Sequence, residues 1–205
     1  MLGAQINDTF AMTEVLPVSG RICTQGHVHH DLNMGLIEII DLATGQPAAP
    51  ARLGTVVITP YYPYRECMPV LRYDTRDVVR RLPEGALTCE LAGIPATSSI
   101  LGKADHLLHL GDSIVTPREL IEVIEALPSQ PWPARFHAQV EGDHIALMVS
   151  PEVVTGVTCA EIERRFHQAN IPVVVTTSED SADASQQLRP LRADLRETTF
   201  AGRRD

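Results

Sequence analysis

The residues best suited to chemistry lie in one short segment near the start of the chain, "CTQGHVHHD" (23–31). It contains Cys23, His27, His29, His30 and Asp31. Thiolate sulfur and imidazole nitrogen together suit a tetrahedral zinc ion. The segment therefore predicts a metal site, structural rather than catalytic. The alternative is a solvated histidine-rich loop, and a zinc hydrolase is disfavoured because no His-Glu-x-x-His pattern supplies a general base.

A second residue is notable because it is rare. Lys103, in "ILGKADH" (100–106), is the only lysine in the chain. The formal net charge is −9 at pH 7, and the sequence pI is about 5.3. This acidic balance argues against a surface that binds nucleic acid or an anionic membrane.

The composition is that of a globular protein, with 44% hydrophobic and 21% charged residues. No apolar run approaches the roughly 18 residues of a transmembrane helix. The start of the chain, "MLGAQINDTF", lacks the basic and apolar regions of a secretory signal. The four cysteines, Cys23, Cys67, Cys89 and Cys159, are therefore expected as thiols or metal ligands rather than disulfides. We expect a soluble cytoplasmic protein.

The first half of the sequence predicts β-structure. β-branched runs predict strands over residues 36–40 and 55–59, and shorter patterns predict two more over 69–74 and 77–82. No long helical pattern interrupts them, so a small sheet or barrel is expected.

Helical patterns begin after about residue 105. Apolar spacing predicts one helix over 116–127, with Thr116 as its N-cap, and a second over 158–170. Thr158 is the expected N-cap of the second helix, and Glu161, three residues on, is expected to complete a capping box.

Strand patterns surround these helices. A hairpin is expected about Gly142-Asp143, and a last strand over 171–177. Strand, helix, hairpin, helix, strand is the order of a ferredoxin-like α+β unit. The polar, charged segment after residue 178 is expected to pack poorly. The sequence thus predicts an α+β protein of two units that meet near residues 102–106.

Three segments of the sequence occur in a characteristic order: "FAMTEV" (10–15), "VVITPYYPYRECMPVLRYDTRD" (56–77) and "ILGKADHLLHLGDSIVTPRELIEVI" (100–124). Together they resemble the adenylate-forming ligases, specifically the phenylacetate–coenzyme A ligase branch. The resemblance covers residues 7 to about 125, and the ferredoxin-like remainder is similar to the mobile C-terminal lid of those enzymes. It implies a β-rich partial core at 1–104, a lid domain at 105–180 and a polar tail at 181–205.

The resemblance implies nucleotide-binding roles at the first segment. Phe10 would stack on adenine, Thr13 would hydrogen-bond the α-phosphate, and Glu14 would hold Mg²⁺ through a hard oxygen ligand. Ala11 stands where the family has a glycine.

The other two segments carry three further roles by resemblance. Asp77 matches an aspartate that accepts hydrogen bonds from the ribose hydroxyls. Lys103 stands where the family has an arginine that reaches the ribose and phosphate, and lysine keeps that charge but loses the planar fork. Asp105 matches the hinge about which the lid rotates. The implied ligand is ATP or AMP with Mg²⁺.

Several family features are missing from the sequence. The family's Ser/Thr/Gly-rich phosphate loop lies upstream of the matched region, and no such stretch occurs here. The tail "SADASQQLRPLRADLRETTF" has no lysine to match the family's catalytic one, and "HLGDSIVTP" (109–117) departs from the coenzyme A loop. We therefore expect the C-terminal half of a ligase: a fragment, one subunit of a split enzyme, or a truncated relative, acting with an N-terminal partner polypeptide or as a homo-oligomer.

The resemblance also extends the metal site. In part of this branch a cysteine, a histidine and a later "CxCG" segment look like zinc ligands, which implies Cys23, His27 and Cys89 here. His29, His30 or Cys67 would be the fourth ligand. Two functions follow as hypotheses: a residual nucleotide site that is catalytically incomplete alone, or a non-catalytic, zinc-stabilised binding module that kept the ligase fold.

Overall fold

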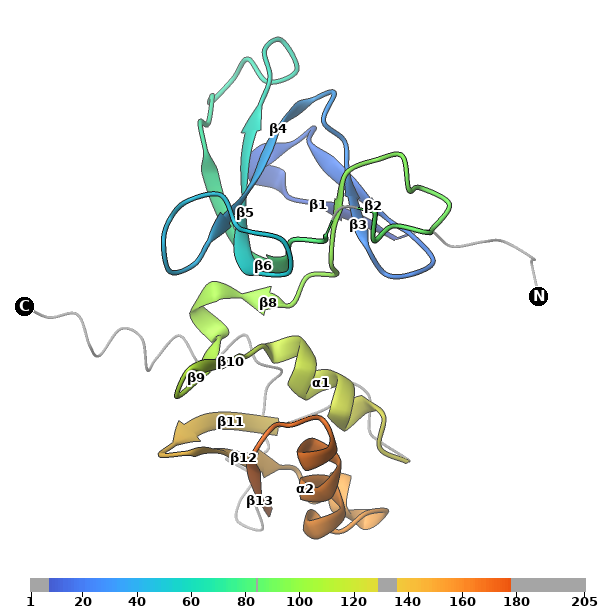
Figure 1. The fold of residues 1–205 in the computed structure, drawn as a ribbon, viewed down its shortest axis with the longest axis vertical. Coiled ribbons are helices and arrows are strands. Elements are labelled where there is room, and N and C mark those ends of the chain that lie inside the picture. The colour runs from blue at the N-terminus through green and yellow to red at the C-terminus, as the bar shows by residue number, and fades with distance from the viewer. Residues whose placement is uncertain (1–7, 84, 129–135, 178–205) are drawn as a thin grey trace, which may run out of the picture. The chain divides into compact units, whose positions relative to one another are not determined.

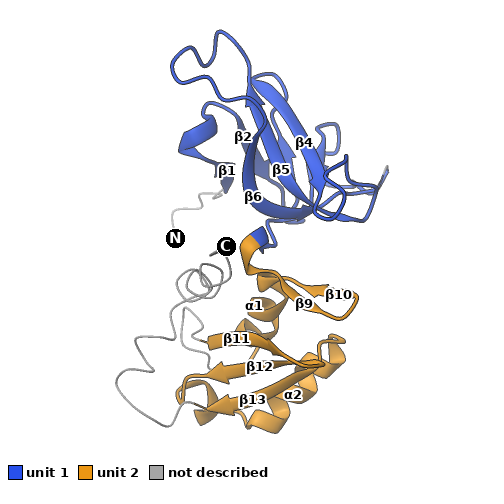
Figure 2. Ribbon diagram, turned by 90° about the vertical axis from the view of Figure 1, so that its left-hand side faces the viewer, with its two compact units in different colours: residues 1–104 blue, residues 105–205 orange. Residues whose placement is uncertain are grey.

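The computed structural model describes residues 8–83, 85–128 and 136–177. The chain divides into two compact units, residues 1–104 and 105–205, shown in different colours in Figure 2. Each unit contains its own hydrophobic core. Within the described ranges, no helix is long and apolar enough to cross a bilayer.

Unit 1 contains two four-stranded antiparallel sheets (Figure 1). The first has the order β1-β2-β3-β7, with strands Thr9–Ala11, Ser19–Ile22, Val28–His30 and Ala96–Thr97. The second has the order β4-β5-β6-β8, with strands Gly35–Asp41, Leu53–Pro60, Tyr73–Arg80 and Gly102–Lys103. The predicted strands over 36–40 and 55–59 are confirmed as β4 and β5.

A small core packs against the second sheet of unit 1. Its fully buried members come from the short 3₁₀ helix η1 (Thr13–Val15), the turn that follows, β5 and β6. They are Val15, Val18, Val56, Ile58 and Val79.

The prediction of two strands over 69–74 and 77–82 is wrong, because one strand, β6, runs from Tyr73 to Arg80. Met68 and Arg72 adopt left-handed backbone with φ of 51° and 48°, which interrupts an extended ladder before Tyr73. Arg76, at φ 60°, lies within β6 and is accommodated by an irregular register between β5 and β6 near Thr55 and Val57.

The described residues of unit 2 form two α-helices, a three-stranded sheet and a separate hairpin. The sheet has the order β11-β12-β13, with strands Phe136–Glu141, His144–Val149 and Val173–Thr177. β9 (Leu108–Leu110) pairs with β10 (Ser113–Val115), and 3₁₀ turns occur at η2 (Ala104–His106) and η3 (Val153–Thr155). The expected hairpin about Gly142 and the last strand are confirmed, and β13 pairs parallel to β12.

The ferredoxin-like order is only partly matched in the described residues. The strand expected before the first helix is a hairpin, β9–β10, outside the three-stranded sheet. Residues 129–135 and the predicted tail at 181–205 lie outside the described residues.

Both predicted helices of unit 2 are confirmed, but their caps differ. In α1 (Pro117–Glu125) the Thr116 side chain accepts from the Glu119 backbone N–H, and the Glu119 carboxylate reaches back to the N-cap backbone, which forms a full capping box. In α2 (Cys159–Gln168) Thr158 accepts from the Glu161 backbone N–H. The prediction that the Glu161 carboxylate would bond back to the N-cap is wrong. This carboxylate accepts hydrogen bonds from Arg164 and Arg165 instead. These hydrogen bonds lower the pKa of Glu161 to about 2.

Candidate functional site

A tight turn between β2 and β3 places three potential metal ligands together. Cys23 follows β2, His27 precedes β3, and His29 lies within β3. The Cys23 backbone N–H donates to the His27 carbonyl at 3.0 Å, and the Gly26 N–H donates to the Cys23 carbonyl at 2.9 Å. Gly26 has a φ of 78°, which favours glycine at the tip of this turn.

The fourth side chain, Cys89, comes from a loop far along the chain. Three hydrogen bonds hold this loop against the turn. The Glu90 carboxylate accepts from the Thr24 backbone N–H at 3.0 Å and from its hydroxyl at 2.8 Å. Gln25 Nε2 donates to Thr88 Oγ1 at 2.9 Å. Glu90 was not identified as a site residue from the sequence. Its position directly after Cys89 is the signal that could have indicated its role.

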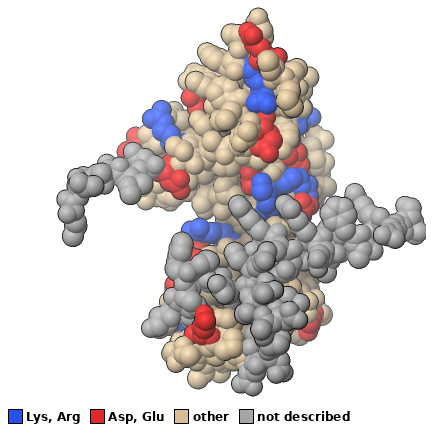
Figure 3. All heavy atoms as spheres, turned by 180° about the vertical axis from the view of Figure 1, so that it is seen from behind, with Lys and Arg blue, Asp and Glu red and all other residues tan. Residues whose placement is uncertain are grey.

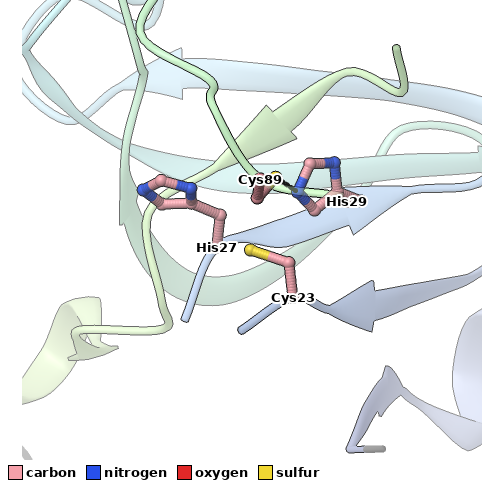
Figure 4. A group of neighbouring side chains, drawn as sticks. All are labelled: Cys23, His27, His29 and Cys89. Atoms are coloured by element: carbon pink, nitrogen blue, oxygen red, sulfur yellow. Dashed lines mark hydrogen bonds between the residues drawn. The ribbon is translucent and has the colours of Figure 1, made fainter. Parts of the chain in front are cut away.

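The four side chains form a compact cluster (Figure 4). One ligand atom from each of Cys23, His27, His29 and Cys89 lies within 4.8 Å of all the others. A tetrahedral zinc ion with bonds of about 2.0–2.3 Å would separate its ligand atoms by roughly 3.3–3.8 Å. A small contraction would therefore close the cluster around one ion.

The hydrogen bonds around the cluster fit metal binding. His29 Nδ1 lies 2.9 Å from the Ile94 carbonyl, which can only accept, so Nδ1 carries the proton and Nε2 keeps its lone pair. This is the outer contact that metal-bound histidines usually make. Nε2 lies 3.2 Å from Cys89 Sγ. His27 Nδ1 is buried and has no hydrogen-bond partner among the described residues, as expected of a nitrogen awaiting a ligand.

The electrostatics of the cluster also favour a cation. Burial and the neighbouring Cys23 raise the pKa of the Cys89 thiol in the metal-free protein. The two thiols, of which Cys23 is buried and Cys89 half-buried, and the two imidazoles offer lone pairs and no positive charge, and a divalent cation would favour the thiolates.

The two other candidates for the fourth ligand lie outside the cluster. His30 Nε2 pairs with Thr97 Oγ1 at 3.1 Å, and burial, then the neighbouring His29, lowers the pKa of His30 to about 4. Cys67 is exposed on the loop between β5 and β6. Asp31 instead accepts from Asn33.

Asp77 and Lys103 are brought together by strand pairing. They are register partners of β6 and β8, and Lys103 Nζ lies 2.8 Å from Asp77 Oδ1. Only 9% of the Asp77 side chain is accessible, whereas 38% of the Lys103 side chain is. A buried carboxylate is therefore neutralised by a cation that still meets solvent.

The irregular register of β6 fixes the Asp77 backbone. The Thr75 hydroxyl donates to the Val56 carbonyl at 2.8 Å and accepts from the Asp77 N–H at 3.1 Å. Lys103 Nζ also donates to the Thr75 carbonyl at 3.0 Å. Thr75 was not predicted as a site residue from the sequence. Its hydroxyl contacts only backbone groups, and such contacts have no recognisable sequence motif.

The other charged pairs of unit 1 are more exposed. Arg76 Nη1 and Asp74 Oδ2 lie 3.7 Å apart, with 47% and 40% of their side chains accessible. Arg72 Nε lies 3.0 Å from Glu38 Oε2. On the face of unit 1 seen in Figure 3, basic and acidic side chains lie next to one another rather than in patches of one sign.

The remaining predicted nucleotide residues lie near the start of unit 1. Phe10, in β1, packs against the core, while Thr13 and Glu14 are exposed on η1. Asp105 is exposed in η2, and unit 2 begins at this residue.

Comparison with known proteins finds no matching family model and no matching curated protein. Solved structures do match. 2-Hydroxyisobutyryl-CoA ligase in complex with 2-HIB-AMP is 18% identical with a TM-score of 0.66, and the match covers 97% of this chain and 44% of that one. The chain has part of the fold of an adenylate-forming ligase.

Two further structures support this assignment of the fold. o-Succinylbenzoate CoA synthetase from Bacillus subtilis, in complex with the acyl-adenylate OSB-AMP, is 17% identical with a TM-score of 0.54, and the match covers 81% of this chain and 34% of that one. Apo MatB from Rhodopseudomonas palustris is 18% identical with a TM-score of 0.55, with 96% and 41% covered. The chain spans less than half the length of each of these ligases.

Proposed function

We propose that this chain is the nucleotide-handling C-terminal half of an adenylate-forming acid–coenzyme A ligase of the phenylacetate–coenzyme A ligase type. In this proposal unit 1 contributes part of the core, and unit 2 is the mobile lid that rotates about Asp105. The chain keeps a residual site for AMP or ATP and is catalytically incomplete on its own.

The observation that carries this proposal is the Asp77–Lys103 pair, within a fold similar to ligases solved with acyl-adenylates. Asp77 Oδ1 is engaged by Lys103, which leaves Oδ2 to accept from a ribose hydroxyl. Two of the three Lys103 N–H groups point at Asp77 Oδ1 and the Thr75 carbonyl. The third is available for a ribose or phosphate oxygen.

The other proposed contacts use side chains of the first segment. Phe10 would lie against the adenine ring, Thr13 would donate to the α-phosphate, and Glu14 would hold Mg²⁺. Thr13 and Glu14 are exposed and therefore accessible to a ligand.

We do not expect adenylation by this chain alone. The sequence holds no phosphate loop, and its only lysine is already paired with Asp77. Joining a carboxylate to the α-phosphate needs charge stabilisation at the transferred group. The remaining parts must come from an N-terminal ligase region, within a longer polypeptide or as a separate partner.

An exposed aromatic loop of unit 1 is a suitable docking surface for that region. It connects β5 to β6 and presents large apolar side chains to solvent, with Tyr62, Met68 and Leu71 each about 80% exposed. Arg65 fixes the loop by donating from Nε to the Met68 carbonyl at 3.1 Å and from Nη1 to the Leu16 carbonyl at 3.0 Å. Ordered, outward-facing aromatic residues are typical of protein interfaces.

A zinc-stabilised, non-catalytic binding module is the second candidate function. The cluster supplies four protein ligands, which is the pattern of structural rather than catalytic zinc because no coordination position is left for water. Under this reading the metal supports the fold and no nucleotide binds.

Calorimetric titration of the zinc-loaded chain with AMP tests the proposal. We expect measurable binding at millimolar AMP, a loss of about 10-fold or more in Asp77→Asn, as for removal of a charged hydrogen-bond acceptor, and no change in Glu38→Gln. Glu38 is a matched control because its carboxylate is also paired with a cation, Arg72, and because it lies in β4 of the same sheet as Asp77. No heat of binding for the unsubstituted chain would favour the non-catalytic module.

A further inference from the structure

One segment of unit 1, residues 89–103, begins at a metal ligand and ends at Lys103. We propose that metal binding at the Cys23–His27–His29–Cys89 cluster positions Lys103 against Asp77, so that occupancy of the metal site sets the nucleotide affinity of unit 1. The part of this inference that concerns nucleotide affinity rests on the proposed function, whereas the mechanical link does not.

The near end of the segment depends on the cluster. Residues 89–94 form turns, with the Ala92 N–H donating to the Cys89 carbonyl and the Ile94 N–H to the Leu91 carbonyl. Within the described residues they belong to no strand. This stretch is joined to the β2–β3 region by Cys89 and Glu90 at one side, and by the Ile94 carbonyl on His29 at the other.

The middle of the segment joins the two sheets of unit 1. The His30 N–H donates to the Pro95 carbonyl at 2.9 Å, and the two residues of β7 pair with β3. At Ser98 the chain next contacts β6 of the second sheet. Ser98 Oγ accepts from the Arg80 N–H at 2.8 Å, and the Ser98 N–H donates to the Arg80 carbonyl at 3.0 Å.

The far end carries the nucleotide residue. The Leu101 N–H donates to the Val78 carbonyl at 2.8 Å, and the two residues of β8 then pair with β6. This short pairing places Lys103 opposite Asp77. Two-residue strands have few hydrogen bonds to lose, so they open at low free-energy cost unless both ends of the segment are held.

The metal changes how firmly the near end is held. Without it, the link between Cys89 and His29 is a single weak S–H donor on an imidazole nitrogen at 3.2 Å. With it, two protein segments share metal–ligand bonds through all four side chains. The long pairing of β4 with β5 does not include the segment, so it should depend much less on the metal.

If a nucleotide requires Lys103 in place, metal and nucleotide binding are linked, and each strengthens the other by the same factor. Couplings of this kind are commonly about 5- to 150-fold. A metal that only stabilised unit 1 as a whole would not distinguish β8 from β4 and β5.

Hydrogen exchange of the full chain, zinc-loaded and after chelation, tests the mechanical link. We expect amide protection in residues 96–103 to fall at least 10-fold more than in β4 and β5. Cys89→Ser should reproduce this pattern with zinc present, whereas Cys67→Ser, a change at an exposed cysteine outside the cluster, should not. Unchanged protection at 96–103, or an equal fall in all of these strands, would overturn the proposal.

AMP titration of the same two samples tests the functional part. We expect chelation to weaken AMP binding at least 5-fold, and re-addition of zinc to restore it. Equal AMP affinity with and without zinc would overturn the coupling. If AMP binds neither sample, the proposed nucleotide function fails, and the exchange data still decide whether the metal positions residues 96–103.

Discussion

Different interactions stabilise the interior of each of the two units. In unit 2 a large apolar cluster joins both helices to the sheet, and its members include Leu120, Ile124, Ile162 and Phe166 at 0% exposure. In unit 1 the shared core is smaller, and polar contacts, an irregular strand and the cysteine–histidine cluster hold long loops in place. Unit 2 should therefore owe its stability to apolar burial, and unit 1 in part to a metal.

Metal removal should change the difference in stability between the two units more than any substitution does. Chelation should lower the free energy of unfolding of unit 1 by about 4 kcal/mol when free zinc was a thousandfold above its Kd, and should leave unit 2 unchanged. Calorimetry, with the transitions assigned by hydrogen exchange, measures both. If the free energy of unfolding changed equally in both units, or in neither, the metal would not be a specific source of stability for unit 1.

Truncation of the apolar core of unit 2 should give the opposite pattern. Ile162→Ala removes a fully buried side chain and should cost unit 2 about 3 kcal/mol. The cost should be the same with and without zinc, because no cluster residue lies in unit 2. Chemical denaturation in both conditions checks this, and a zinc-dependent cost would contradict the separation of the two units.

The helix caps of unit 2 should give smaller effects. Thr116→Ala removes the hydroxyl that accepts from the Glu119 backbone N–H and donates to the Glu119 carboxylate, and should cost about 1 kcal/mol. Thr158→Ala removes only the hydroxyl that accepts from Glu161, so its cost should be lower. Denaturation midpoints of the two variants rank them, and the reverse order would show that the bond between the Thr116 hydroxyl and the Glu119 carboxylate contributes little.

Acid should weaken unit 2 over a defined range. The side chains of Arg164 and Arg165 hold the pKa of Glu161 at about 2, below its unfolded value of 4.5. The stabilisation is therefore complete above pH 4.5 and is lost as the pH falls toward 2. Unfolding of unit 2 followed by circular dichroism should show this dependence, and Glu161→Gln should flatten it. An unchanged profile in that variant would assign the acid sensitivity to other carboxylates.

The two units also differ in how much of their structure could be predicted from the sequence. Both helices of unit 2 followed from apolar spacing and from Thr116 and Thr158, because these signals are local. The single strand β6 was missed because Met68 and Arg72 adopt left-handed backbone without being glycine.

The cysteine–histidine cluster was also only partly predictable from local sequence. Cys23, His27 and His29 lie within one short pattern, whereas Cys89 was found only through family resemblance because it lies far along the chain. The Ile94 carbonyl that orients His29 has no side-chain signal. The pairing of Lys103 with Asp77 depends on strand register, which their separation in sequence does not fix.

An AMP titration of the zinc-loaded, ¹⁵N-labelled chain, followed by NMR, tests directly for the residual nucleotide site in unit 1. We expect shifts concentrated at β6 and β8, around Thr75, Asp77 and Lys103, that saturate at millimolar AMP and are absent in Asp77→Asn. No shifts at these amides, with the chain folded and zinc bound, would contradict a residual nucleotide site in unit 1.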